Sequence, residues 1–188
     1  FRRQRQMCIR DSYSPTSGFH GIDATTAAPN DYDYDNAPKK KYGYPSIGIP
    51  GTVKGLERGL KDYGSLDLSS VMVDAITYAE EGHFLIEGEA KRLESVNKEL
   101  NEFKGTREYF TNSDGSPLKS GKLLIQKDLS NVLKAISTQG SSVFYTGWIA
   151  KKMIEDNKKN GGVLSMKALA SYCLLYTSDA ADERLRVD

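Results

Sequence analysis

The stretch PSIGIPGTVKGL, residues 45–56, divides this chain into two halves of different character. The sequence before it is polar and rich in Tyr and Asp, whereas apolar residues recur at helical spacing after it. Pro50 and Gly51 predict a turn, because proline fixes its own φ and glycine permits backbone angles closed to other residues. Thr52 is then the expected N-cap of a helix that ends at Gly64. The chain is therefore expected to change from loop to helix at this turn.

A glycine-rich turn that opens a helix has two interpretations. The free amides and the dipole at the start of the helix can bind an anion. Alternatively, the glycines only reverse the chain and let the helix pack closely. No Lys-Ser or Lys-Thr pair follows the glycines, as a phosphate-binding loop requires, so the structural interpretation is favoured.

Composition limits the class of protein. The 188 residues are enough for the core of one domain. The chain has 26 Lys and Arg against 25 Asp and Glu, which predicts neither a nucleic-acid partner nor an anionic membrane surface as partner. No apolar run reaches the length of a membrane-spanning segment, and the N-terminus has no apolar signal-peptide region.

Arginine and lysine are unevenly distributed along the chain. Residues 1–12 and 173–188 contain six arginines and no lysine, whereas residues 13–172 contain three arginines and seventeen lysines. Both cysteines, Cys8 and Cys173, also lie in these ends, which resemble translated sequencing-adapter strings. We predict that the two ends are non-native flanks, with disordered native tails as the alternative. The stretch between them has no cysteine, which excludes disulfides and thiolate chemistry there.

A cluster of Asp and Thr follows a short extended segment near the N-terminus. Apolar residues alternate from Gly18 onwards, and the segment ends in Asp23-Ala24-Thr25-Thr26. Such a cluster can hold a ligand at the end of a strand. It forms an Asx or Ser/Thr turn just as readily, and this second interpretation is favoured because it is the commoner one.

Three aspartates, Asp31, Asp33 and Asp35, alternate in the segment that follows. In an extended chain they would face one way. The segment lacks the glycine and the distal glutamate of an EF-hand, so we predict a solvated loop and no metal site.

Helical periodicity dominates the rest of the chain. Asp67 or Ser65 is expected to cap the first of these helices, Asp128 a later one and Ser165 the last. The aromatic stripe that includes Trp148, the single tryptophan, is expected in the core. Helices are predicted over residues 65–82, 86–103, 106–110, 128–140, 141–160 and 165–172, with a short strand over 122–125.

No catalytic constellation can be identified from residue patterns alone. The two histidines, His20 and His83, lie far apart, and neither belongs to an HExxH motif. The GxSxG motif of a serine hydrolase is also missing.

Five stretches, taken in order, resemble the gamma-glutamyltransferase (glutathione hydrolase) family. Each stretch alone is weakly specific, but the ordered set covers residues 20–172. The stretches are IGIPGTVKGL (47–56), Ala75-Ile76 with Ala79, Gly82 and Phe84, GKLLIQKDL (121–129), Gly140 with FYTGWIA (144–150), and NGGVLSMKALASY (160–172).

The resemblance implies an α/β (αββα) N-terminal-nucleophile hydrolase, made as a precursor that cleaves itself to expose a catalytic threonine. Residues 13–172 would be a mainly helical middle part of the large subunit. The nucleophile would lie in the missing small subunit, so no catalytic residue is expected here. The implied substrates are γ-glutamyl small molecules such as glutathione, attacked without a cofactor by the threonine hydroxyl. The implied location is periplasmic or extracellular.

One departure from the family pattern concerns the acyl group. The family's D-x-R-E-x-A-P motif aligns with Asp23 and Pro29, which places Thr25 at its arginine and Thr26 at its glutamate. That arginine would bind the α-carboxylate of the γ-glutamyl group, and threonine has no such charge. Asp23, Thr25 and Thr26 are the candidate substrate-binding residues. Either another basic residue replaces the arginine, or the protein is a related amidase or acylase for a different acyl group; a non-catalytic helical interaction domain is the third alternative.

Overall fold

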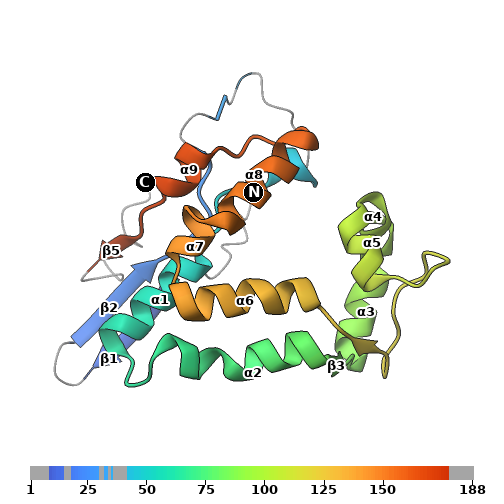
Figure 1. The fold of residues 1–188 in the computed structure, drawn as a ribbon, viewed down its shortest axis with the longest axis horizontal. Coiled ribbons are helices and arrows are strands. Elements are labelled where there is room, and N and C mark those ends of the chain that lie inside the picture. The colour runs from blue at the N-terminus through green and yellow to red at the C-terminus, as the bar shows by residue number, and fades with distance from the viewer. Residues whose placement is uncertain (1–8, 15–17, 30–31, 34, 36–41, 178–188) are drawn as a thin grey trace, which may run out of the picture. The chain divides into compact units, whose positions relative to one another are not determined.

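The computed structural model describes residues 9–14, 18–29, 32–33, 35 and 42–177 (Figure 1). Helices dominate the secondary structure of this part of the chain, as the periodicity predicted. The chain divides into two compact units. The first contains the described residues of Phe1–Asp67 and Gln139–Asp188, and the second is Leu68–Thr138. Among the described residues, no helix combines the length and apolar character that crossing a membrane requires.

The first unit joins a small antiparallel sheet to short helices. Its elements are β1 (Ile9–Ser14), β2 (Gly18–Asp23), the 3₁₀ helix η1 (Tyr44–Ser46), α1 (Thr52–Tyr63), α7 (Ser142–Tyr145), α8 (Trp148–Lys159), α9 (Met166–Ala170) and β5 (Leu175–Thr177). Strand β2 lies in the middle of the order β1-β2-β5, so that Asp23 is opposite both Ile9 and Leu175. The outer strands draw residues from 1–12 and 173–188, and the origin of those flanks stays a prediction.

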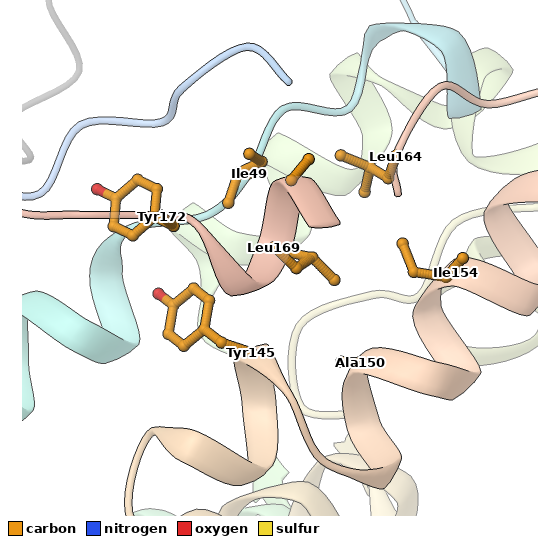
Figure 2. Packing of buried hydrophobic residues seen from close by; sticks show 8 residues of the cluster. Ile49, Tyr145, Ala150, Ile154, Leu164, Leu169 and Tyr172 are labelled. Carbon is orange, nitrogen blue, oxygen red and sulfur yellow. The ribbon is translucent and has the colours of Figure 1, made fainter. Parts of the chain in front are cut away.

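One cluster of buried side chains holds α7, α8 and α9 against the turn before α1 (Figure 2). Ala150 of α8 and Leu169 of α9 have no exposed surface, and Ile49 of the turn is 3% exposed. Burial of apolar surface contributes roughly 25 cal/mol per Å², so this cluster anchors the C-terminal helices to the turn.

Asn157, which is 2% exposed, lies beside this cluster with its amide satisfied. Its Oδ1 accepts the backbone N–H of Leu164 at 2.9 Å, and its Nδ2 donates to the carbonyl of Tyr44 at 3.4 Å. A buried amide needs such partners, because an unpaired polar group in the interior is costly. Asn157 therefore ties the turn after α8 to η1.

The expected helix over 141–160 is instead two helices, α7 and α8, with a break at Gly147. Gly147 is extended (φ −86°, ψ −157°), which is incompatible with a continuous helix. Because the break interrupts the helical spacing, Tyr145 is buried whereas Trp148 is 40% exposed. The prediction that Trp148 lies in the core was therefore wrong.

The second unit is built from helices and a two-stranded antiparallel ribbon. Its elements are α2 (Leu68–Glu81), β3 (His83–Phe84), α3 (Glu87–Ser95), α4 (Asn97–Glu102), α5 (Lys104–Phe110), β4 (Leu123–Leu124) and most of α6 (Lys127–Gln139). One buried cluster of this unit contains Leu85, Leu118 and Leu124, with Leu93 and Phe110 packed against them. Strand β4 confirms the predicted strand over 122–125.

Some predicted helix limits are confirmed and others are wrong. Gly82 follows α2 with a φ of +91°, and the Ser165 side chain accepts the N–H of Ala168 at the start of α9. The single helix expected over 86–103 is broken at Val96, whose φ of −120° is not helical. Valine and the asparagine after it both have low helix propensity, which accounts for the break. Asp128 lies inside the first turn of α6 and is not its cap.

Candidate functional site

The loop of residues 23–29 holds the three predicted substrate-binding residues and begins where β2 ends. Both the backbone N–H of Thr25, at 2.8 Å, and its hydroxyl donate to Oδ1 of Asp23. This is the Asx and Ser/Thr turn that the sequence favoured. Thr25 and Thr26 are exposed and Asp23 is half-buried, so the loop presents two hydroxyl residues and one carboxylate to solvent.

The glycines of the PSIGIPGTVKGL stretch lie where this loop packs directly on the turn and on α1. A Cβ at Gly51 would overlap the carbonyl of Ala24, and one at Gly55 would lie 2.5 Å from the Ala24 Cβ. A Cβ at Gly48 would lie 2.6 Å from Cγ2 of Thr26. Glycine is therefore required at these positions for close approach of the two segments.

A short β-bridge adds to this close packing. Ala27 and Ile49 exchange backbone hydrogen bonds, with N···O distances of 3.1 and 2.8 Å. The main chain of the loop is thus paired with the main chain of the turn. The turn serves the loop as a backbone scaffold.

The start of α1 is capped in a way that the sequence did not predict. The N-cap residue is Gly51, not Thr52, and it makes no side-chain cap. The hydroxyl of Tyr145 takes that role instead, since it accepts the N–H of Lys54 at 3.4 Å and donates to the carbonyl of Pro50 at 2.6 Å. One free amide of the helix start is thus paired with a protein hydroxyl, in line with the structural interpretation.

Burial raises the pKa of Tyr145 to about 12, while the hydrogen bond from the Lys54 backbone opposes this rise. The side chain is 3% exposed. The neutral hydroxyl is therefore the stable form over the whole physiological range, which suits a group that must both donate and accept.

Tyr172 connects this cap to the loop. Its ring stacks on that of Tyr145, with centroids 5.7 Å apart and planes at 7° (Figure 2). Its hydroxyl donates to the carbonyl of Thr25 at 2.9 Å. The backbone of Thr25 is thus fixed by a residue 147 positions away in the chain.

Lys54 places a cation near both rings. Its Nζ lies 5.4 Å from the ring centroid of Tyr145 and 6.0 Å from that of Tyr172, within the range of cation–π contacts. It also donates to the backbone carbonyl of Tyr172 at 2.6 Å. Thr25 is bound at the opposite, hydroxyl end of the same tyrosine.

The other candidates from the sequence are not brought to this loop. His83 lies in the second unit, with Nε2 3.5 Å from Oε1 of Glu89, and the side chain of His20 is outside the described residues. Asp31 is also outside them, and the carboxylate of Asp33 accepts the N–H of Asp35. Within the described part of the chain, no three His, Cys, Asp or Glu residues are grouped to hold a metal ion.

Sequence reasoning missed Lys54, Tyr145 and Tyr172 as residues that support the loop. Their hydrogen bonds to the loop, the turn and each other's segments span 91 to 147 positions in the chain, which no local pattern reveals. A signal was nonetheless present, because all three lie inside stretches that resemble the family.

The comparison with known proteins decides the family. The family model described as gamma-glutamyltranspeptidase matches residues 8–179. The chain belongs to the gamma-glutamyltranspeptidase family. The predicted resemblance is thereby confirmed, and the match extends beyond residues 13–172 at both ends.

Individual relatives agree with this assignment. The glutathione hydrolase proenzyme of Pseudomonas sp. (strain A14) is 32% identical over 130 residues, which cover 69% of this chain and 23% of the relative. The glutathione hydrolase proenzyme of Escherichia coli (strain K12) is 32% identical over 143 residues, which cover 74% of this chain and 24% of the relative. The chain therefore spans about a quarter of the length of these curated relatives.

A solved structure supports the fold. The gamma-glutamyltranspeptidase of Helicobacter pylori superposes with a TM-score of 0.84 at 29% identity, over 89% of this chain and 51% of that one. The helical segment is therefore part of an N-terminal-nucleophile hydrolase fold, as expected.

Proposed function

We propose that this chain is part of a precursor whose mature form hydrolyses or transfers γ-glutamyl groups through a threonine acyl-enzyme. The observation that carries the proposal is the family match over residues 8–179. Relatives called glutathione hydrolase proenzymes support glutathione as a substrate and a precursor that is processed.

The reaction divides one amide cleavage into two acyl transfers. The threonine hydroxyl attacks the γ-glutamyl carbonyl, its proton passes to the threonine α-amine, and the leaving amine departs with a proton. Water or an amino acid then releases the acyl group and regenerates the hydroxyl. The nucleophile belongs to the small subunit, outside residues 1–188, so this chain alone is inactive and the small subunit is its partner.

Asp23, Thr25 and Thr26 form part of the acyl-group site in this proposal. The Asp23 carboxylate accepts two hydrogen bonds from Thr25, so this part of the loop presents a carboxylate and hydroxyl residues. A free α-carboxylate would meet no cation from Thr25. This favours a second candidate function, an amidase or acylase whose acyl group has no α-carboxylate.

Two anilides distinguish these functions in the enzyme expressed from its full reading frame. The proposal expects self-cleavage and release of aniline from a γ-glutamyl anilide, while the separate 188-residue chain releases none. Turnover of a 4-aminobutyryl anilide, which keeps the amine but has no α-carboxylate, without turnover of the γ-glutamyl anilide would overturn the proposal in favour of the second function. Turnover of neither would overturn both, and activity of the chain alone would show that its nucleophile lies within it.

Thr25→Arg gives a matched variant for the same assay. Introducing an arginine is expected to raise the turnover of the γ-glutamyl anilide relative to the 4-aminobutyryl anilide, because a guanidinium binds a carboxylate through two parallel hydrogen bonds. Ala28→Arg, at an exposed position of the same loop outside the candidate site, is the control and should not change this ratio. An unchanged ratio in Thr25→Arg would remove residue 25 from the acyl-group site.

A further inference from the structure

Both faces of the two-stranded ribbon of the second unit carry large apolar side chains. His83 pairs with Leu124, and Phe84 pairs with Leu123. Directly opposed residues of an antiparallel pair point to the same side, and successive residues point to opposite sides. One face therefore carries His83, Leu85 and Leu124, and the two leucines are buried against Leu118.

The opposite face is apolar and open to solvent. Its four side chains come from both strands and from the residues that follow them, at the same alternation. The exposed fractions are 68% for Phe84, 66% for Ile86, 40% for Leu123 and 40% for Ile125. We call these four residues the outer ribbon face.

The ribbon cannot bury this face by slipping or turning over. Leu85 donates to the carbonyl of Lys122 at 2.9 Å and accepts from the N–H of Gly121 at 2.8 Å, and Gln126 donates to Ala79 at 2.9 Å. A one-residue slip would move Leu85 and Leu124 out of the core. The outer ribbon face is thus held outward, and a contiguous exposed apolar patch of this kind is often an interaction site.

We infer that the outer ribbon face is the docking surface for a segment of the same precursor that lies outside residues 1–188. The inference rests on the proposed function in one respect, that the chain is part of a longer polypeptide. The curated relatives reported above are about four times as long as the region they share with this chain, so most of such a precursor is available to cover the face.

The exposed area of the outer ribbon face favours a covalently linked segment over a second copy of the chain as its occupant. With roughly 200 Å² for a large apolar side chain, the exposed fractions leave on the order of 400 Å². A standard interface buries about 800 Å² on each partner, so the face is too small to hold a separate chain firmly. A tethered segment has an effective concentration of about a millimolar and can occupy such a small surface.

Cysteine labelling tests this inference. Cys8 and Cys173 are replaced by serine, and Ile86→Cys is introduced into both the 188-residue chain and the full precursor. Glu94→Cys, an exposed position on α3, is the control. Ile86→Cys is expected to react with a maleimide freely in the chain and at least tenfold more slowly in the precursor, whereas Glu94→Cys reacts alike in both. Hydroxyl-radical footprinting of Phe84 in the unsubstituted proteins checks the result without a variant.

The outcomes separate this inference from the proposed function. Equal labelling of Ile86→Cys in chain and precursor would overturn the inference, as would protection already present in the chain. If that protection grows with protein concentration, a second copy is the occupant. Turnover of the γ-glutamyl anilide is measured on the same precursor, so protection without turnover refutes the proposed function and leaves the docking surface intact.

Discussion

The hydroxyl of Tyr145 gives a direct test of how the turn before α1 is held. Tyr145→Phe keeps the ring, its burial and its stack on Tyr172, and removes one oxygen. The carbonyl of Pro50 and the N–H of Lys54 then lose their partner. The substitution therefore isolates the cap from the packing around it.

The expected loss of stability is about 2 kcal/mol, because leaving a buried donor or acceptor without a partner costs about 1–3 kcal/mol. The 3.4 Å contact with Lys54 adds less than the 2.6 Å bond to Pro50. For a chain of this size, about 2 kcal/mol corresponds to a fall in Tm of about 4–8 °C.

The pH dependence of the free energy of unfolding is a second test of the Tyr145 hydroxyl. Folding raises the pKa of Tyr145 from 10.0 to about 12, through burial. A raised pKa means that the folded state favours the neutral form, so this contribution is complete below pH 10 and is lost as the pH rises from 10 through 12. A pKa difference of one between the folded and unfolded states corresponds to about 1.4 kcal/mol, which sets an upper limit of about 2.7 kcal/mol on the loss. The stability difference between wild type and Tyr145→Phe should therefore shrink above pH 10.

The assay is urea unfolding followed by tryptophan fluorescence at pH 8, 10 and 11.5. Trp148 is the only tryptophan and lies in the same unit as Tyr145, so its emission reports on the correct unfolding step. Tyr78→Phe, at a side chain that is 63% exposed, is the control and should leave stability unchanged. The capping role would be refuted if the free energy of unfolding of Tyr145→Phe lies within about 0.5 kcal/mol of that of wild type, which is the range of neutral surface substitutions. It would also be refuted if the difference between the two proteins stays constant to pH 11.5.

Three further substitutions test the scaffold of the loop. Tyr172→Phe removes the hydrogen bond to the Thr25 carbonyl, so the free energy of unfolding of the chain in urea should fall by about 1 kcal/mol. The KM of the full enzyme for its acyl donor should rise. If neither value changes, this hydrogen bond does not support the loop. Gly51→Ala should lower the free energy of unfolding by more than about 2 kcal/mol, because the new Cβ overlaps the carbonyl of Ala24. Gly88→Ala, with open space around it, is the control and should raise the free energy of unfolding by up to about 1 kcal/mol. Equal effects of the two substitutions would show that the loop does not pack on Gly51. Asn157→Ala should cost about 1–3 kcal/mol, and a calorimetric Tm within 1 °C of wild type (well under the shift expected for 1 kcal/mol) would contradict its role.

The sequence predicted the helix ends and caps that depend only on neighbouring residues. Gly64 and Gly82 end their helices as expected, and Ser165 caps α9 with its own side chain. The failures at Val96 and Gly147 share a cause, since continuous apolar spacing does not reveal a break in the backbone.

The prediction that Thr52 caps α1 was wrong for a different reason. The group that satisfies the helix start comes from Tyr145, far along the chain, and makes a local cap unnecessary. The candidate site shows the same division. The turn between Asp23 and Thr25 follows from neighbouring residues, but the bond from Tyr172 that fixes it depends on the packed core.

The shape of the loop depends on main-chain groups and not on the side chain of residue 25. This matters because the motif alignment places Thr25 at the family's arginine. Tyr172 binds the carbonyl of Thr25, and Gly51 and Gly55 leave room for Ala24. None of these contacts uses the side chain of residue 25. An arginine or a threonine can therefore occupy the position on the same backbone, at the cost of one exposed hydrogen bond to Asp23. In the proposed acyl-group site, a threonine in place of an arginine would therefore change the chemistry presented to the acyl group on an unchanged backbone scaffold.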